Sequence, residues 1–190
     1  MAKVKWDPGT MLSPLPAALI SCGTMEHPNV MTAAWTGIIN SNPPKAYVSI
    51  RPGRLSHQLI SENKFFVINV AGEKLKYAVD FCGVKSGRDT DKFTACQLTA
   101  QESFEVESPS ILESPVSMEC RVFQVIRLGS HDMFLADIVA VSVEDSLLEN
   151  NRLALEKAGV VSYIHGEYYA PGEYIGHFGW TVKKNKKIGK

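Results

Sequence analysis

The chain has 190 residues, of which 45% are hydrophobic and 21% are charged, a composition typical of ordinary globular proteins. It excludes a largely disordered chain, and we expect a single domain over residues 1–190 with a basic tail at about 183–190. The 20 lysines and arginines balance the 20 aspartates and glutamates. Zero net charge argues against nucleic acid as the main partner, because such proteins need a basic surface.

Membrane and metal functions find little support in the sequence. No stretch approaches the roughly 18 apolar residues of a membrane span, and two prolines interrupt the short apolar patch LPAALI near the N-terminus. We therefore expect neither a membrane contact nor a signal peptide. The four cysteines form no CxxC pair, so we expect reduced thiols, a cytoplasmic protein and no zinc site. The cysteines are Cys22, Cys82, Cys96 and Cys120.

Strands dominate the expected secondary structure of the first half. Apolar, β-branched runs bounded by Gly, Pro or Asn predict strands at PAALISCGT (16–24), VMTAAWTGII (30–39), AYVSI (46–50) and FFVINVA (65–71). Between the last two runs, LSHQLISEN (55–63) has the pattern of a short helix with Ser56 as its N-cap and with Leu59 and Ile60 facing the core. A second helix is expected in EKLKYAVDFCG, ending at Gly83.

The second half predicts a long hairpin. PVSMECRVFQVIRL (115–128) and DMFLADIVAVSV (132–143) have the patterns of two long strands, and the tight turn Gly129–His131 joins them. Strands outnumber helices and no βαβ rhythm repeats. We therefore expect a mainly β fold, a closed or nearly closed barrel whose ends are covered by short helices.

Arg51 and Arg54 stand where a strand ends and a helix begins. The N-terminus of a helix offers unpaired N–H groups and the positive end of the dipole. Two guanidiniums and a hydroxyl at that place suit a phosphate, although pairing with Glu62 or another carboxylate would explain them equally well. The Gly-containing loop CGVKSGRDTDKF (82–93) adds a weak second signal for phosphate. In NVMTAAW (29–35), small residues would let a flat ligand approach a strand, with Trp35 packed on it or in the core.

Four ordered segments resemble one known family. They are NVMTAAWTGIINSNPPKAYVSIRPGRLSHQLI, FCGVKSGRDTDKF, GSHDMFLADIVAV and EYYAPGEYIGHFGW. Together, over about Leu15 to Trp180, they resemble the flavin reductase-like family of FMN-binding split barrels, and within it the flavoredoxins. The resemblance implies a Greek-key-like split β-barrel that forms a homodimer and binds one FMN per subunit near the dimer interface.

The resemblance also implies a set of site residues. Arg51, Arg54 and Ser56 would meet the FMN phosphate together with Lys92 and Ser86, and Asn29 and the backbone of residues 31–35 would lie along the ring. The full set of expected cofactor-binding residues is Asn29, Met31, Thr32, Ala33, Ala34, Trp35, Ser49, Ile50, Arg51, Arg54, Ser56, Cys82, Ser86, Gly87, Asp91, Lys92, Phe93, His131, Tyr163 and Ile164.

For two residues, His131 and Cys82, the sequence leaves two roles open. His131 is the expected catalytic residue, close to the flavin, where it would contact a nicotinamide or donate a proton; an exposed turn histidine is the alternative. Cys82 would be a redox thiol near the site or a buried, inert cysteine.

Three functions remain open at this stage. The first is a flavoredoxin-like FMN protein that carries electrons between redox partner proteins. The second is an NAD(P)H:flavin oxidoreductase, and the third is a flavin-binding module without turnover. The first two share one fold and one pocket, so the fold alone does not separate them.

Overall fold

The computed structural model describes residues 1–182, and the lysine cluster Lys183–Lys187 of the expected basic tail lies outside the described residues. The strands are β1 (Leu15–Pro16), β2 (Ala18–Gly23), β3 (Pro28–Ala33), β4 (Thr36–Ser41), β5 (Pro44–Ile50), β6 (Phe65–Asn69), β7 (Ala100–Gln101), β8 (Ser110–Ile111), β9 (Val116–Arg127), β10 (Asp132–Val143), β11 (Leu148–Glu149), β12 (Arg152–Leu153), β13 (Ser162–Ile164) and β14 (Glu167–Tyr169). The α-helices are α1 (Leu55–Asn63), α2 (Lys76–Val84) and α3 (Lys92–Ala95), and the 3₁₀ helices are η1 (Glu73–Leu75), η2 (Asp145–Leu147), η3 (Leu155–Ala158) and η4 (Trp180–Val182).

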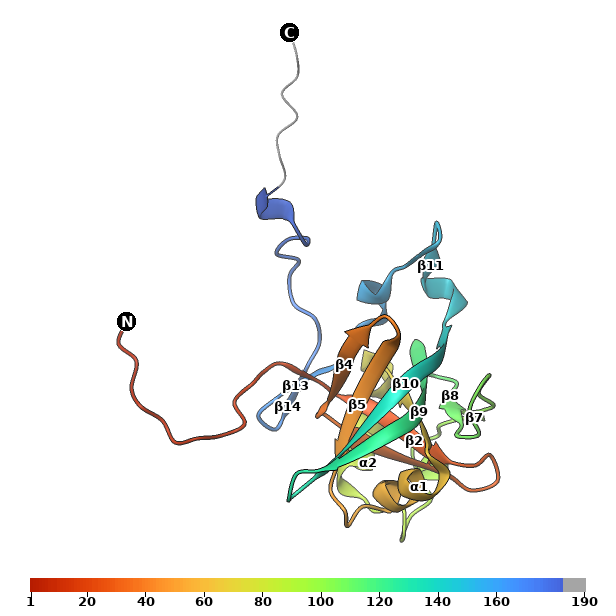
Figure 1. Cartoon of the computed structure of the whole chain (residues 1–190). Coiled ribbons are helices and arrows are strands. Elements are labelled where there is room, and N and C mark those ends of the chain that lie inside the picture. Colours follow the sequence, from red (N-terminus) through yellow and green to blue (C-terminus); the bar gives the residue numbers. More distant parts are fainter. Residues whose placement is uncertain (183–190) are drawn as a thin grey trace.

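The fold is mainly β, as expected, and one large sheet organises it. Seven strands follow the order β3-β2-β6-β9-β10-β5-β4, and every neighbouring pair is antiparallel. The sheet curls into a barrel with α1 at one end and α2 on its outer side (Figure 1). The predicted long hairpin is confirmed as β9 and β10, which project beyond the body of the barrel (Figure 1).

Two hydrophobic clusters explain the apolar runs of the first half. The barrel interior gathers side chains from β2, β3, β5, β6, β9, β10 and α1, with Phe66 and Phe134 among the largest fully buried. A second cluster lies between β2, β3 and the helices α2 and α3. Ile20 belongs to the first and Leu19 to the second, so β2 is buried on both faces and therefore reads as a continuous apolar run.

The expected single strand over 30–39 is wrong. β3 ends at Ala33, a bend contains Ala34 and Trp35, and β4 begins at Thr36. The reason is topological: β3 and β4 are the two opposite edges of the seven-stranded sheet, so the chain must turn between them.

Both expected helix boundaries also differ from the structure. α1 begins at Leu55 with Arg54 at the N-cap position, and no side chain caps it, so Ser56 is not the N-cap. The second helix starts as the 3₁₀ helix η1 and continues as α2 to Val84, which places Gly83 inside the helix. A Cβ at Gly83 would lie 3.5 Å from the Thr32 side chain, an ordinary contact distance, so α2 packs against β3 at this position without requiring a glycine.

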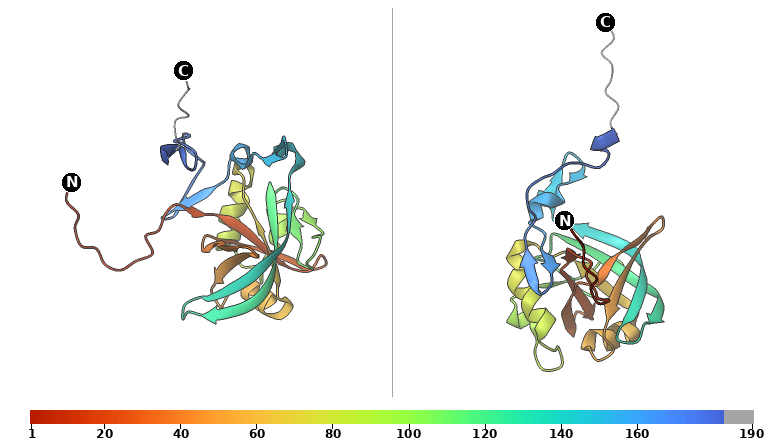
Figure 2. Two further views of the ribbon diagram at one scale, coloured as in Figure 1. Left: turned by 45° about the horizontal axis from the view of Figure 1, so that its top comes forward. Right: turned by 90° about the vertical axis from the view of Figure 1, so that its left-hand side faces the viewer.

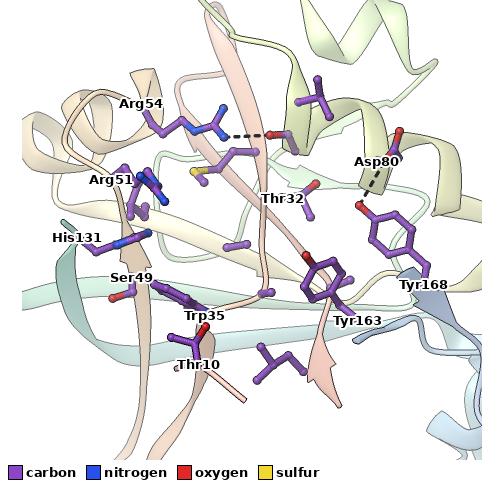
Figure 3. Close-up of a pocket in the computed structure, with 18 of the residues that line it drawn as sticks. Thr10, Thr32, Trp35, Ser49, Arg51, Arg54, Asp80, His131, Tyr163 and Tyr168 are labelled. Carbon is purple, nitrogen blue, oxygen red and sulfur yellow. Dashed lines mark hydrogen bonds between the residues drawn. The ribbon is translucent and has the colours of Figure 1, made fainter. Parts of the chain in front are cut away.

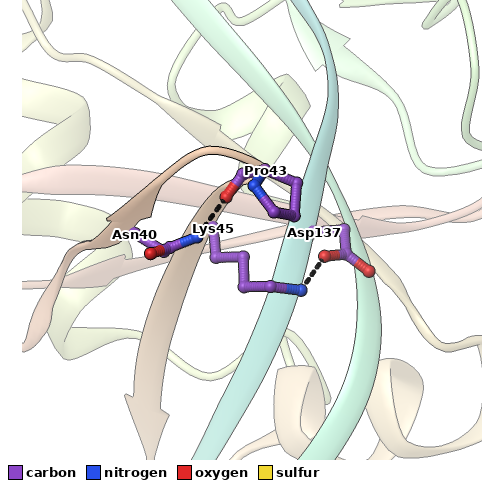
Figure 4. A network of polar contacts seen from close by, with 4 residues as sticks. All are labelled: Asn40, Pro43, Lys45 and Asp137. Carbon is purple, nitrogen blue, oxygen red and sulfur yellow. Dashed lines mark hydrogen bonds and ion pairs between the residues drawn. The ribbon is translucent and has the colours of Figure 1, made fainter.

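Polar contacts fasten β5 to its neighbours at the end of the barrel far from α1. Lys45 forms an ion pair with Asp137 of β10 (Figure 4). The Lys45 ammonium also lies 4.1 Å from the ring centroid of Phe123. At the β4–β5 turn, the side chain of Asn40 donates to the carbonyl of Pro43 at 2.7 Å (Figure 4). These contacts fix β5, whose other end carries Arg51.

The terminal segments lie largely apart from the barrel. Most of the N-terminal segment and residues 170–182 extend away from it in Figure 1 and in the left view of Figure 2. Trp6, Leu12, Tyr174 and Trp180 are exposed on these segments. Among the described residues, no helix is long and apolar enough to cross a membrane.

Candidate functional site

The site begins at the seam where β3 meets β5. The backbone N–H of Ser49 donates to the carbonyl of Trp35 at 2.8 Å, which joins the bend after β3 to β5. The side chain of Thr32 donates to the carbonyl of Val79 at 2.5 Å and ties the same strand to α2. Three elements therefore converge here, and the small side chains of Ala33 and Ala34 leave space between them.

A cavity of about 470 Å³ occupies this space. Its size lies in the range of sites for small organic ligands. Its walls come from the end of β3, the end of β5, α2, the tip of the β9–β10 hairpin, the N-terminal segment and the β13–β14 hairpin. We call it the central cavity; Figure 3 shows most of its lining. The lining residues are Thr10, Ser13, Leu15, Ala17, Met31, Thr32, Ala33, Ala34, Trp35, Ser49, Ile50, Arg51, Arg54, Asp80, Gly83, Val84, His131, Tyr163, His165 and Tyr168.

Positive charge gathers at one end of the central cavity. Arg51 and Arg54 come from the connection between β5 and α1, and Arg54 donates to the carbonyl of Gly83 at 3.0 Å (Figure 3). Within residues 1–182 neither arginine belongs to an ion pair, and Glu62 instead accepts a hydrogen bond from Gln58. Pairing with Glu62 therefore does not explain the two arginines, and their guanidiniums remain available to an anion.

Trp35 and His131 form the wall beside Arg51. Their ring centroids are 4.5 Å apart with a tilt of 48°, and Ser130 Oγ lies 3.0 Å from His131 Nδ1. Burial lowers the pKa of His131, and the nearby positive charge of Arg51 lowers it further. His131 is therefore a neutral imidazole at pH 7, able to donate one hydrogen bond and to accept another.

The opposite wall is aromatic and carries one carboxylate. Tyr163 and Tyr168 pack with ring centroids 5.8 Å apart, and the hydroxyl of Tyr168 donates to Asp80 at 3.4 Å (Figure 3). Burial raises the pKa of Tyr168, and Asp80 raises it further. The central cavity is therefore cationic at Arg51 and Arg54 and carries a negative charge across from them at Asp80.

A second cavity, of about 510 Å³, lies on the other side of the Gly-containing loop. We call it the loop cavity; its lining includes Asn29, Gly87, Asp91 and Lys92. Lys92 is 4% exposed, and its ammonium donates to the carbonyls of Cys82 and Lys85, both at 3.3 Å. Burial lowers the pKa of Lys92, and Arg54 contributes to the lowering. No ion pair of the described chain includes this buried cation, so a bound anion would stabilise it.

Ser56 is linked to the loop cavity through Asn29, which lines it. The amide of Asn29 donates to the Ser56 hydroxyl at 2.8 Å and contacts the sulfur of Cys22 at 3.5 Å. A Cβ on Gly87 would lie 2.0 Å from the side-chain oxygen of Asn29. The loop backbone therefore rests directly on Asn29, and a side chain at position 87 would force the loop or the Asn29 amide to move.

The central cavity brings together eleven of the expected site residues, while others lie elsewhere. Cys82 and Phe93 are buried in the cluster beneath α2 and α3. Asp91 caps α3 by accepting from the backbone N–H of Thr94 at 3.2 Å, and the hydrogen bonds from Thr94 lower the pKa of Asp91. Two further expected residues, Ser86 and Ile164, also lie outside the lining of the central cavity. The Ser86 hydroxyl accepts from the backbone N–H of Arg88 at 3.1 Å, and Ile164 is the last residue of β13.

Several lining residues had no sequence signal. Thr10, Ser13, Leu15 and Ala17 come from the N-terminal segment, and Asp80, Gly83 and Val84 from α2. Asp80 occupies a polar position on an amphipathic helix, which by itself indicates only a solvent-exposed face. His165 and Tyr168 come from the β13–β14 hairpin, in an aromatic-rich part of the sequence that does not by itself indicate a ligand site.

Comparisons with known proteins agree on one family. Residues 11–171 match the family model described as flavin reductase like domain. A curated protein of Archaeoglobus fulgidus without a described function is 37% identical over 135 residues, which are 71% of this chain and 76% of that protein. An FMN reductase (NADH) of Enterobacter cloacae is 26% identical over 58% of this chain and 65% of its own length.

Among solved structures, the flavoredoxin of Desulfovibrio vulgaris (Miyazaki F) aligns with a TM-score of 0.88 and 30% identity, over 96% of this chain and 100% of that one. This likeness confirms the expected split-barrel fold. The family match spans most of the chain, and the fold and the cavity at the β3–β5 seam agree with it. The chain belongs to the flavin reductase-like family, whose members include flavin-binding redox proteins.

Proposed function

We propose that this chain binds FMN and carries electrons between redox partners, as a flavoredoxin does. The observation that carries the proposal is a set of three cations, Arg51, Arg54 and Lys92, which form no ion pair within residues 1–182 and lie by a cavity large enough for a flat ligand. The FMN phosphate is close to doubly charged, and guanidiniums with a buried ammonium match such an anion.

The residues of the central cavity fit the remaining parts of FMN. Met31, Ala33 and Ala34 provide an apolar surface that a flat ring can approach, and Trp35 provides an aromatic edge. When bound, FMN supplies a ring that accepts either a hydride or single electrons. The chain would orient that ring, exclude water from one face through β3, and place His131 beside the other.

His131 is the proposed catalytic residue. Because its pKa is lowered, it is neutral at pH 7 and can hydrogen-bond to the ring or to an incoming nicotinamide without adding charge. Tyr163 stands on the opposite side of the cavity as a further contact. Lys92, together with Ser86 and Gly87 of the loop, would complete the phosphate site that begins at Arg51 and Arg54, and Asn29 would hold the loop in place.

A second candidate is an NAD(P)H:flavin oxidoreductase. The relative from Enterobacter cloacae is named an FMN reductase that uses NADH. In this chain Trp35 is 37% exposed beside the central cavity, where a nicotinamide could stack on it.

We further propose that the whole chain is one FMN-binding domain, that it forms a homodimer and that it works in the cytoplasm. Exposed apolar side chains on β4 and β10 support the dimer, among them Ile38, Ile39 and Val141.

One experiment separates the two candidates. The protein loaded with FMN is mixed without oxygen with NADH or NADPH, and the loss of visible flavin absorbance is followed. For a carrier we expect slow bleaching with either nucleotide and rapid bleaching with a reduced redox protein. Bleaching by NADH or NADPH at several turnovers per second would make the chain a reductase instead.

A further inference from the structure

The sulfur atoms of Cys82 and Cys96 lie 3.8 Å apart, although fourteen positions separate them in sequence. Cys82 is fully buried near the end of α2, and Cys96 is half-buried directly after α3. The other two cysteines, Cys22 and Cys120, are 0% exposed. The structure therefore contains a dithiol that the spacing of its cysteines does not reveal.

We propose that Cys82 and Cys96 are a modification site that forms a reversible disulfide, which closes the loop between α2 and α3. The S–S bond is about 2.05 Å long, so the two sulfurs need to approach by roughly 1.8 Å. Cys96 follows the last turn of the four-residue helix α3. The Cys96 N–H donates to the carbonyl of Lys92 at 3.1 Å, so the approach of the two sulfurs comes from rotation of their side chains and a small shift of this helix end.

The reaction begins at Cys96, which solvent can reach. Burial raises the pKa of Cys82 to about 12, so this thiol stays protonated near neutral pH. Burial also raises the pKa of Cys96, while the hydrogen bond from Cys82 and the charge of Lys92 oppose the rise. Oxidation is therefore slower than at an activated thiolate, and it is directed to the less buried sulfur.

The oxidant is a hydroperoxide, here hydrogen peroxide. The sulfur of Cys96 attacks one oxygen, the O–O bond breaks, and a sulfenic acid and one water are formed. The sulfur of Cys82 then attacks the sulfenic sulfur, the S–O bond breaks, and the proton of Cys82 leaves with the hydroxide as a second water. The two thiols lose two electrons and two protons in total, and the peroxide is reduced to two waters.

The disulfide would act directly on the cations of the site. The carbonyl of Cys82 accepts from Lys92, and the carbonyl of the next residue, Gly83, accepts from Arg54. The closed loop also carries Ser86 and Gly87. Bonding Cys82 to Cys96 therefore reduces the freedom of the backbone that positions both cations.

Trypsin supplies a direct test, because Lys85 and Arg88 are exposed within this loop. The full chain is treated with hydrogen peroxide, the remaining thiols are alkylated, and trypsin is then added without reductant. We expect slower cleavage after Lys85 and Arg88 than in the reduced chain. Once cut, the peptides with Cys82 and Cys96 should stay joined, lighter by two hydrogens, and dithiothreitol should separate them.

Two variants complete the test. Cys96→Ser should abolish the joined peptide and the slower cleavage, whereas Cys120→Ser should change neither. In Cys82→Ser, a dimedone label should appear on Cys96, because no partner thiol is left to consume the sulfenic acid. Cys120 shares the tryptic peptide 93–121 with Cys96, so fragmentation of the joined peptides must locate the bond. If all four cysteines are alkylated after peroxide treatment, or if the disulfide lies on Cys22 or Cys120, the assignment is wrong.

Discussion

Nε2 of His57 lies 2.9 Å from Oδ2 of Asp132, and this hydrogen bond joins the first turn of α1 to the first residue of β10. His57 also packs edge-on against Phe134, with ring centroids 5.1 Å apart. Arg54 precedes His57 by three residues, and His131 precedes Asp132. The pair therefore fixes the distance between the cationic end of the central cavity and the proposed catalytic histidine.

The substitution Asp132→Asn should weaken the contact between His57 and Asp132. Asp132 is buried, so losing a charged partner there should lower the free energy of unfolding by about 1–3 kcal/mol. Urea denaturation measures the change. Glu73→Gln, which removes the exposed pair between Glu73 and Lys76, should cost less than about 0.5 kcal/mol. Equal effects of the two substitutions would contradict a role for the His57–Asp132 pair.

Gly87→Ala tests the contact between the loop and Asn29. The new Cβ would lie 2.0 Å from the side-chain oxygen of Asn29, so the loop or the amide must move. We expect a loss of about 1–3 kcal/mol in stability and weaker FMN binding. Gly53→Ala is the matched control, since a Cβ there meets nothing within 4 Å. Unchanged stability and affinity in Gly87→Ala would mean that the loop does not rest on Asn29 in solution.

Lys92→Met tests the buried ammonium through pH. Burial lowers the pKa of Lys92 in the folded protein, so between that lowered pKa and the ordinary value of about 10.4 the unfolded chain binds more protons. The free energy of unfolding of the FMN-free wild type should therefore rise with pH in that window. The difference from Lys92→Met isolates this residue, and a difference independent of pH would contradict the prediction.

His131→Ala tests catalysis separately from binding. His131 lines the central cavity but is not one of the proposed phosphate-binding cations. Its loss should therefore leave FMN affinity nearly unchanged while it slows reduction of the bound flavin. Stopped-flow absorbance under anaerobic conditions with FMN saturating gives the rate. Unchanged kinetics would remove His131 from the mechanism. The conservative variant His131→Gln should retain more of the rate if hydrogen bonding is what matters.

Arg51→Gln tests both the anion site and its neighbour. The pKa of His131 should rise, because the nearby guanidinium is one cause of its lowering. A histidine titration by NMR measures it. FMN should bind about tenfold more weakly or worse, since a charge-assisted hydrogen bond to a phosphate is lost. The control Arg152→Gln, at an exposed position, should change neither the pKa of His131 nor the affinity for FMN.

The sequence predicted the strands better than it predicted the site. Alternating and continuous apolar runs identified β5, β6 and the β9–β10 hairpin, because burial on one or both faces sets those patterns. The bend at Ala34 and Trp35 was missed, because the pattern continues through it while the chain crosses from one sheet edge to the other.

The missing parts of the site depend on tertiary contacts. Asp80 and Tyr168 are 88 positions apart, and only the packing of the β13–β14 hairpin near α2 brings them together. The contact between Cys82 and Cys96 likewise depends on how α2 and α3 meet over the second hydrophobic cluster. No local pattern contains that information.

The central claim is that Arg51, Arg54 and Lys92 form a phosphate site beside a flavin pocket. Calorimetric titration of the flavin-free protein with FMN, and separately with riboflavin, tests it most directly. We predict one FMN per chain, and a dissociation constant for riboflavin at least about tenfold higher, because riboflavin lacks the phosphate. Equal affinities, or no binding of either flavin, would contradict the account.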